Sequence, residues 1–441
     1  MISGSNYLCF QTWFMKKKEQ IFLFLSLLFY STFFISSIKP ATPFALTILS
    51  VFCLAWGPFS AKLRLVKQRP FLLLMVGFAL WLLVSAFTSA NQHSAGRVLE
   101  LRLPLLLLPL TLGTLEIRRA LRNRILVGAA VITLIACLVS LSFAVYQYNK
   151  TGLNFWLYND SVSYLIGQQS IYTSLLVNMS IFIFAWIIFY SGSFKKYHGW
   201  MAFGIAVLLV ISYMLASRNM MFVLYAGLFI FCFVYLFGRK KYLEGFTLLL
   251  AIGIGGFLIV KFFPNTINRF QELRLTSFDY KNTNRESHYN DSLTADQWNG
   301  ANFRLAAWPL GWKLFKEHSL TGVGIGDKRD ELMAVYREKE FRFAIETNKN
   351  VHNNYLDILY STGLIGFLLF FTGWILLPLI RFIKARDGIS IVLTLVAAIA
   401  MFTENYFDRT LGSMIFSFLL LILLVADNTR VRHETSEVEL Q

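Results

Sequence analysis

The stretch HNNYLDILYSTGLIGFLLFFTGWILLPLI, residues 352–380, decides how the chain is organised. Its first three residues are polar, and from Tyr355 onward it is apolar and long enough for a helix to cross the ~30 Å hydrocarbon core of a membrane. The long polar stretch 263–353 ends at the same histidine. A polar domain therefore enters a bundle of apolar helices through His352, which suggests chemistry at a membrane surface rather than passage through the membrane.

The composition indicates a membrane protein throughout. Of 441 residues, 56% are hydrophobic and only 15% are charged, whereas a soluble domain is roughly half apolar and a quarter charged. Recurring apolar stretches predict an all-α polytopic membrane protein with about 12 transmembrane helices. The expected spans are 21–38, 41–59, 70–89, 99–115, 125–147, 170–191, 199–216, 219–237, 243–262, 355–380, 389–407 and 410–426. The fourth is the weakest, because Pro104 and Pro109 lie inside it.

The net charge of +16 follows the expected topology. Alternate short connections carry most of the basic residues, among them Lys16–Lys18 and Arg118–Arg124. Because basic residues stay on the cytoplasmic side, both termini are expected inside and the long polar loop outside. We therefore expect contact with membrane lipids and no nucleic-acid partner. The first apolar run lacks a clear cleavage site and is followed at once by another span, so it does not read as a signal peptide.

Several kinds of site are missing from the sequence. The four cysteines lie in the cytoplasmic tail or in expected spans, which excludes a disulfide framework in the outside loop. No Cys/His cluster has zinc spacing, and there is no Walker loop or dinucleotide fingerprint. We expect no metal, no cofactor and no direct use of ATP.

The spans divide the chain into four parts. Residues 1–262 hold the first nine helices, 263–353 form the outside loop domain between helices 9 and 10, 354–426 hold the last three helices, and 427–441 form a cytoplasmic tail. Within the loop, 303–318 has an amphipathic helical pattern, and 328–340 predicts a second helix that Asp327 is expected to cap. The intervening Gly322–Gly326 run does not follow a strand, so a turn is favoured over a phosphate cradle.

Arginines are scarce on the predicted outer side. Arg218 lies in a very short connection between two spans, Arg304 begins the amphipathic segment, and Arg102 sits a turn inside the fourth span. A guanidinium group is always charged, and its planar fork suits phosphate oxygens. The alternative for each is an interfacial arginine that snorkels to water. Arg409 can instead pair with a neighbouring carboxylate.

His352 is the candidate base, because imidazole can accept a proton near neutral pH. A lone loop histidine is usually inert, but this one lies where a lipid-linked substrate would present its head group. Asn353 beside it can supply an oriented amide. Gly363 and Gly366, three apart on the expected helix face, permit close helix packing that would hold the histidine end rigid.

Three carboxylates near the predicted outer face are weaker candidates. Asp357 lies one turn into the tenth span, Glu404 near the end of the eleventh, and Asp408 just beyond it. Carboxylates at such depth are functional candidates, but each can simply pair with a neighbouring arginine. No two have the spacing of a glycosidase pair.

These features together resemble a known family. They are Arg218 at the end of the seventh span, Arg304 with Trp308 and the later Gly322–Gly326 run, and the signature His352-Asn353…Gly363-Leu364-Ile365-Gly366. They resemble the O-antigen ligase and polymerase superfamily of bacterial membrane glycosyltransferases, and the topology is most similar to the ligase branch. One departure is Phe222, which stands where ligase-like enzymes often have leucine.

The resemblance implies transfer of a glycan from undecaprenyl diphosphate to an acceptor hydroxyl at the periplasmic face of the bacterial inner membrane, without metal or nucleotide. His352 would take the acceptor proton. Arg218 and Arg304, with Arg102 as a weaker third, would stabilise the diphosphate leaving group. A single base predicts inversion at the anomeric carbon, and the ligase topology favours lipid A-core as acceptor.

Other functions stay open at this point. A repeat-unit polymerase or a protein O-oligosaccharyltransferase of the same superfamily differs only in its acceptor. A transporter of polyanionic lipids would also need outer arginines, but the chain shows no inverted repeat or paired broken spans. A structural scaffold gives no reason for the placement of the arginines and the histidine.

Overall fold

The computed structural model describes residues 4–35, 38, 40–239, 276–284 and 297–427, with scattered residues between 242 and 274. The expected ninth span, 243–262, lies largely outside the described residues. So do residues 263–273, 275 and 285–296 of the expected loop domain and residues 428–441 of the expected tail.

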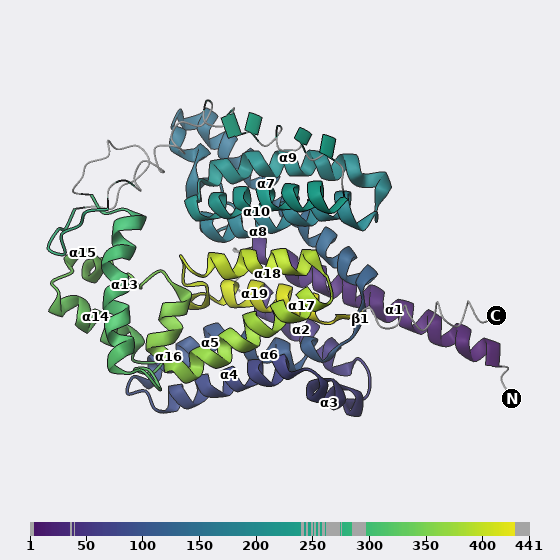
Figure 1. Ribbon diagram of the computed structural model, residues 1–441, viewed down its shortest axis with the longest axis horizontal. Coiled ribbons are helices and arrows are strands. Elements are labelled where there is room, and N and C mark those ends of the chain that lie inside the picture. Colours follow the sequence, from purple (N-terminus) through teal and green to yellow (C-terminus); the bar gives the residue numbers. More distant parts are fainter. Residues whose placement is uncertain are drawn as a thin grey trace.

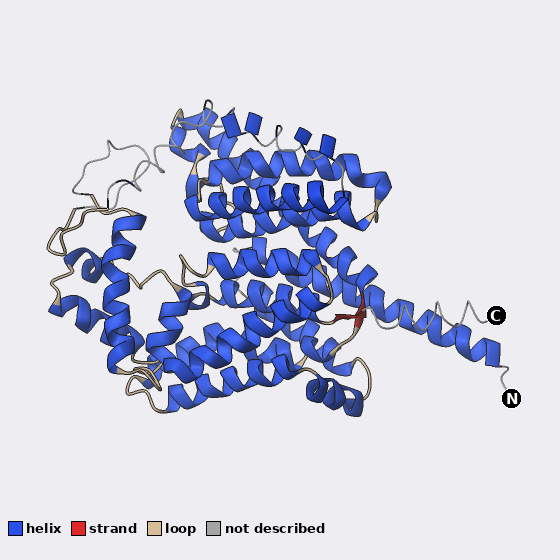
Figure 2. Ribbon diagram, viewed as in Figure 1, coloured by secondary structure: helices blue, strands red, loops and turns tan. Residues whose placement is uncertain are grey.

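Helices make up most of the described chain, as Figure 2 shows. Among the residues that the structure describes, six helical segments are long and apolar enough to cross a membrane. They are α4 (Pro70–Phe87), α7 (Arg119–Thr151), α8 (Ser170–Trp186) with η5 (Ile187–Ser191), α9 (His198–Leu215), α10 (Arg218–Arg239), and α16 (Asn354–Phe371) continued by η8 (Thr372–Leu376) and α17 (Leu377–Lys384). The protein is therefore an all-α, multi-pass membrane protein.

The predicted count of twelve spans is not confirmed, and the differences have local causes. α2 (Ala41–Ala55) bends by 99° into α3 (Phe59–Gln68), and the two form a seventh span only if taken together. The fourth expected span is divided between α5 (Gln92–Arg102) and α6 (Pro104–Leu110), because Pro104 has no backbone N–H to continue α5 and instead occupies the first position of α6. α18 (Gly388–Ala400) and α19 (Thr410–Leu424) have 13 and 15 residues, fewer than the ~20 that span a bilayer.

The bundle consists of two groups of helices, which Figure 1 shows one above the other. The upper group holds α7–α10, and the lower group holds α4–α6 and α16–α19. α18 packs against α8 and α10 and joins the two groups around one large apolar core. α1 (Gly4–Ser31) packs against α2 and α7. In the described part of the chain, strand pairing is confined to β1 (Ile117–Arg118) and β2 (Ala426–Asp427), which run parallel and join the start of α7 to the end of α19.

A smaller helical domain covers one end of this bundle (Figure 1). It contains α13 (Gly300–Glu317), α14 (Lys328–Glu338) and α15 (Arg342–Glu346), so the helices expected at 303–318 and 328–340 are confirmed. Asn299 caps α13 by accepting hydrogen bonds from two backbone N–H groups. The domain has a separate apolar core that includes Trp298, Phe303, Tyr336, Phe341 and Phe343.

Asp327 does not cap α14 as the sequence predicts. Its carboxylate accepts hydrogen bonds from the backbone N–H groups of Ala90 and Asn91, each at 2.7 Å. These two residues lie in the turn between α4 and α5. Asp327 therefore fastens the small domain to the bundle, a contact that depends on residues far away in the sequence.

The domain also pairs with a break in α16. Gly363 has φ 67° and ψ −172°, which interrupts the helix. The backbone of residues 319–324 lies beside 360–365, and the N–H of Val323 donates to the carbonyl of Tyr360 at 2.9 Å. The backbone groups that lose their helical hydrogen bonds at the break therefore bond to the small domain. These bonds attach the domain to α16 about three turns beyond His352.

Candidate active site

His352 lies in the turn between the small domain and α16. Its backbone has φ 46°, a left-handed conformation, and its N–H donates to Oδ1 of Asn350 at 3.0 Å. The imidazole packs edge-on against the ring of Phe303, with the centroids 5.6 Å apart. The turn and the ring contact together fix where the imidazole points.

Glu404 is the partner of this imidazole. Its Oε2 and Oε1 lie 3.1 and 3.2 Å from Nδ1 of His352. Glu404 comes from the connection 401–409 between α18 and α19. A carboxylate at Nδ1 favours the tautomer that carries its proton there, which leaves Nε2 as a hydrogen-bond acceptor. This is the arrangement of a general base oriented by a third group.

The charges around Glu404 keep it ionised. Burial alone raises the pKa of its carboxyl group, but the interaction with His352 and then the charge of Arg304 bring that pKa below its ordinary value. One oxygen also accepts the backbone N–H of Asn405 at 3.0 Å. Glu404 can therefore stabilise a proton received by the imidazole.

Two of the predicted arginines meet at the start of α13. The Arg304 guanidinium donates through Nη2 to the carbonyl of Thr403 at 2.6 Å, and through Nη1 to the carbonyl of Gly300. A Cβ at Gly300 would lie 2.8 Å from Nη1 of Arg304 and 3.0 Å from Nη2 of Arg218. Both guanidinium groups therefore flank the same glycine, next to the segment that carries Glu404.

A buried ionic network adjoins the His352 turn, because Nδ2 of Asn350 donates to Oδ2 of Asp408 at 2.8 Å. Nζ of Lys328 is 2.9 Å from both carboxylate oxygens of Asp357 and 2.5 Å from Oδ1 of Asp408. Nη2 of Arg102 is 2.8 Å from Asp357 and 3.8 Å from Asp408. Two cations thus balance two carboxylates, and the network joins α5, α14 and α16 to the connection before α19.

The structure places Arg102 in this buried network. Its side chain is only 1% exposed and its Nη2 pairs with Asp357, whereas Arg218 and Arg304 flank Gly300. The alternative that Asp357 pairs with a nearby arginine is confirmed. Arg409 does not follow the same pattern, because its guanidinium lies over the ring of Tyr172 at 5.8 Å.

A cavity of about 620 Å³ opens beside the His352–Glu404 pair. Both residues line it, and cationic side chains surround it. The cations Arg97, Lys328, Arg329 and Arg409 outnumber the carboxylates Glu404 and Asp408 in the lining, which also includes the polar residues Asn350 and Gln169. The cavity therefore combines a candidate base with positive potential, which suits an anionic substrate.

The predicted supporting residues Asn353, Gly363 and Gly366 shape the backbone and packing of α16. Oδ1 of Asn353 accepts the N–H groups of Tyr355 and Leu356, both at 3.0 Å, so this amide caps α16 instead of facing a substrate. Gly363 and Gly366 do not share one continuous helix face, because the helix breaks at Gly363. A Cβ at Gly363 would lie 2.2 Å from the carbonyl oxygen of Leu320.

Gly366 packs against α4, as the prediction of helix contact requires. A Cβ there would lie 2.8 Å from Cδ1 of Trp81, whose Nε1 donates to the carbonyl of Thr362 at 2.9 Å.

The glycine-rich run 322–326 is a turn, as the sequence favours. All five of its N–H groups donate within the protein. The acceptors are the carbonyls of His318, Tyr360 and Ser361 and the hydroxyls of Ser85 and Ser89. No N–H of the run is left for a phosphate.

Sequence reasoning missed three important partners. Glu404 is separated from His352 by 52 positions, and Lys328 from Asp408 by 80. Asn354, directly after the capping residue, holds the 401–409 connection: its Oδ1 accepts the N–H of Phe407 at 3.1 Å and its own N–H donates to Met401. The available signal was the presence of three carboxylates at the same predicted membrane depth as His352.

Comparison with protein families gives one match. Residues 203–371 match the family model described as O-antigen ligase. This segment runs from α9 to the end of α16 and contains Arg218, Arg304 and His352. Comparison with curated proteins gives no significant match. Residues 203–371 are therefore similar to the O-antigen ligase family.

Proposed function

We propose that the protein transfers a glycan from undecaprenyl diphosphate to an acceptor hydroxyl at the periplasmic face of the bacterial inner membrane. The observation that carries this proposal is the His352–Glu404 pair, which lines a cavity of about 620 Å³ with cationic walls. The superfamily supports a glycosyltransferase-like ligase. The geometry around His352 supports the roles that we propose for the individual residues.

His352 is the proposed general base. The acceptor hydroxyl gives its proton to Nε2 of His352 while its oxygen bonds to the anomeric carbon of the glycan. The bond from that carbon to the diphosphate oxygen breaks, and its electron pair leaves with the diphosphate. Glu404 stabilises the imidazolium that forms. Direct attack opposite the leaving group predicts inversion of the anomeric configuration.

Arg218 and Arg304 are the proposed partners of the diphosphate. Negative charge grows on the leaving group as the bond breaks, and fixed cations stabilise that charge. The two guanidinium groups flank Gly300, and each offers a planar fork that matches phosphate oxygens. Arg304 also touches the Glu404 segment through Thr403, which links the leaving-group site to the base.

The proposed acceptor is lipid A-core. This choice rests on the similarity of residues 203–371 to the family described as O-antigen ligase. It makes a polymerised O-antigen on its lipid carrier the donor and a core hydroxyl the nucleophile.

The test is a gel of surface lipopolysaccharide from a strain that lacks the gene. The strain is complemented with the wild-type protein, with His352→Ala or with His318→Ala, an exposed histidine of the same domain. We expect the long-chain ladder with wild type and His318→Ala. His352→Ala should leave bare core and polymerised chains on the carrier.

Other gel patterns would contradict the ligase assignment. Core that bears a single repeat would identify a polymerase. An unchanged ladder in every strain would exclude both activities and leave protein glycosylation or transport.

A further inference from the structure

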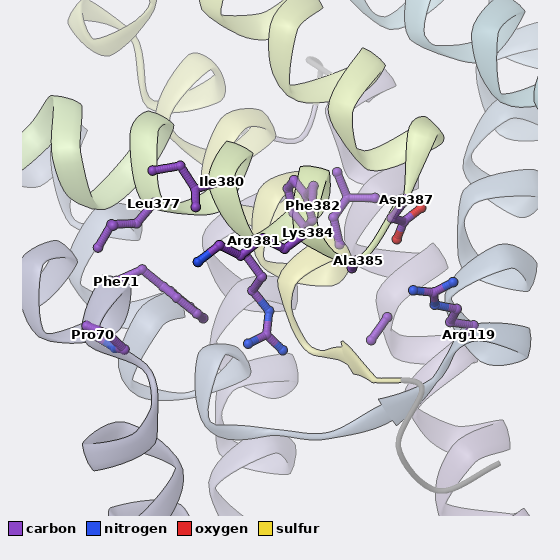
Figure 3. Close-up of a pocket in the computed structure, with 12 residues that line it drawn as sticks. Pro70, Phe71, Arg119, Leu377, Ile380, Arg381, Phe382, Lys384, Ala385 and Asp387 are labelled. Atoms are coloured by element: carbon purple, nitrogen blue, oxygen red, sulfur yellow. The ribbon is translucent and has the colours of Figure 1, made fainter. Parts of the chain in front are cut away.

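A second cavity lies at the opposite end of the bundle from His352. It has a volume of about 480 Å³ and is bordered by the start of α4, the start of α7, α17 and the end of α19 (Figure 3). The membrane-length segment Asn354–Lys384 starts next to His352 and ends at this cavity. The two cavities therefore face opposite ends of one span.

Positive charge dominates the polar part of this cavity. Arg119, Arg381 and Lys384 line it, and Figure 3 shows their side chains around the opening. Nε of Arg119 is buried and has no hydrogen-bond partner among the residues that the structure describes. The Arg381 guanidinium lies over the ring of Phe71 at 5.8 Å, which holds it at the cavity wall.

Asp387 does not neutralise these three cations. It is the single carboxylate among the described lining residues. Its Oδ2 is already bound by Nη1 of Arg122 and accepts the hydroxyl of Ser390 at 3.0 Å. The cavity therefore keeps an excess of positive charge, in a position where an anion would have two or three cationic partners.

The rest of the lining is apolar. Phe71, Leu377, Ile380, Phe382 and Leu423 form these walls. Ile380 is 38% exposed on α17, within the membrane-length segment Asn354–Lys384. A small inorganic anion would gain nothing from such walls, whereas a lipid can place its phosphate on the cations and its glycerol and acyl carbons against the apolar side chains.

We propose that this cavity binds the phosphate of an anionic glycerophospholipid of the surrounding membrane. The site is distinct from the His352 site and does not rest on the proposed glycan transfer. A bound phospholipid would bridge α7, α17 and α4, and so would hold together the end of the bundle where β1 and β2 meet.

The chain itself contains a competing occupant. Ala426 lines the cavity, and the residues that follow it include Glu434, Glu437 and Glu439. An acidic tail could offer carboxylates to the same cations. The experiment therefore includes a chain that ends at Asp427.

Native mass spectrometry of the full chain in detergent measures the binding of phosphatidylglycerol, phosphatidylcholine and inorganic phosphate. The test variant is Arg381→Gln with Lys384→Gln. The matched control is Lys195→Gln with Lys196→Gln, which removes two exposed charges from a connection away from the cavity. Thermal unfolding without added lipid verifies that each variant is folded.

The proposal predicts that phosphatidylglycerol binds more tightly than phosphatidylcholine. Binding should weaken about fivefold for each charge removed in the test variant, and should be unchanged in the control variant and in the chain ending at Asp427. Equal binding by test and control variants would overturn the proposal. Full displacement of the lipid by equimolar inorganic phosphate, or lipid binding only after removal of the tail, would overturn it as well.

Discussion

At the scale of single residues, Glu404 orients the imidazole ring of His352 and balances the charge of its protonated form. The carboxylate at Nδ1 favours the tautomer in which Nε2 is unprotonated, and the lowered pKa of Glu404 keeps this carboxylate ionised beside the ring. The edge-on contact with Phe303 restricts ring rotation. A proton taken from the acceptor would thus be shared with a carboxylate that is already in place.

Substitution of Glu404 tests this pairing. Glu404→Gln keeps the size of the side chain but removes the charge that stabilises the imidazolium, so kcat should fall about 10–100-fold with little change in the KM for the lipid-linked donor. Glu404→Asp should recover part of the loss because it restores the charge. An equal loss of activity in the Gln and Asp variants would argue for a purely structural role.

Arg218 and Arg304 should affect the chemical step through the leaving group. Replacement of Arg218 by Ala should lower kcat on the order of 10²–10³-fold, the scale of removing one donor to a developing charge. Arg218→Lys should recover only part of the lost kcat, because an ammonium group lacks the planar fork of a guanidinium group. Arg337→Ala, an exposed arginine of α14, is the control and should have wild-type rates. If Arg337→Ala and Arg218→Ala lose activity equally, the assignment of Arg218 is wrong.

At the scale of elements, the break in α16 fixes the position of the small domain. Residues 319–324 pair with the opened backbone at 360–365, which requires a glycine at both Gly322 and Gly363. A Cβ at Gly322 would lie 2.4 Å from the backbone carbon of Ser361. Neither backbone can move without releasing buried hydrogen bonds.

The substitution Gly363→Ala should therefore lower thermal stability and abolish activity, because both the positive φ and the contact with Leu320 disfavour a side chain. Gly96→Ala is the matched control. Gly96 lies in α5 with open space around it, so this change should be neutral or stabilising by up to about 1 kcal/mol. Thermal unfolding in detergent measures both variants, and a Gly363→Ala protein as stable as wild type would contradict the account of the break.

The ionic network gives stability a definite pH dependence. Burial raises the pKa of Asp408, but Lys328 and Arg102 lower it below its ordinary value of 3.8. A carboxyl group with a lowered pKa contributes stability that is present above that ordinary value and is lost as the pH falls below it. The melting temperature should therefore be flat from neutral pH to about 5 and fall below about 4.

Asp408→Asn should melt at a lower temperature near neutral pH and show less pH dependence. Asp357→Asn leaves Lys328 and Arg102 without their main partner and should cost about 3–5 kcal/mol. A wild-type pH profile in Asp408→Asn would contradict the role of the network.

At the scale of the whole molecule, the two cavities lie at opposite ends of the bundle. In one cavity the cations surround a histidine–glutamate pair, and in the other they lie beside apolar walls. The small domain closes one end, where His352, Glu404 and the arginines gather. The other end keeps Arg119, Arg381 and Lys384 around a cavity with apolar walls. Each end has a polar site, and the apolar core between them holds the long helices in register.

Much of this organisation could be predicted from the sequence, because hydropathy and charge are local properties. Spans such as 70–89, the helices of the small domain and the position of His352 at its junction follow from residue patterns. The pairing of His352 with Glu404, the burial of Arg102 and the break at Gly363 do not. Each depends on a tertiary contact between segments far apart in the chain, which no local periodicity encodes.

The most direct test of the account is reconstitution of the purified protein with undecaprenyl diphosphate-linked glycan and an acceptor. Mass spectrometry would follow release of the lipid diphosphate, and NMR would report the anomeric configuration of the product. We predict that the wild-type protein and His318→Ala both release the lipid diphosphate and transfer the glycan with inverted configuration. The His352→Ala protein should neither release the lipid diphosphate nor transfer the glycan. Near-normal transfer by His352→Ala, or retained configuration in the wild-type product, would contradict the assignment of His352 as the base.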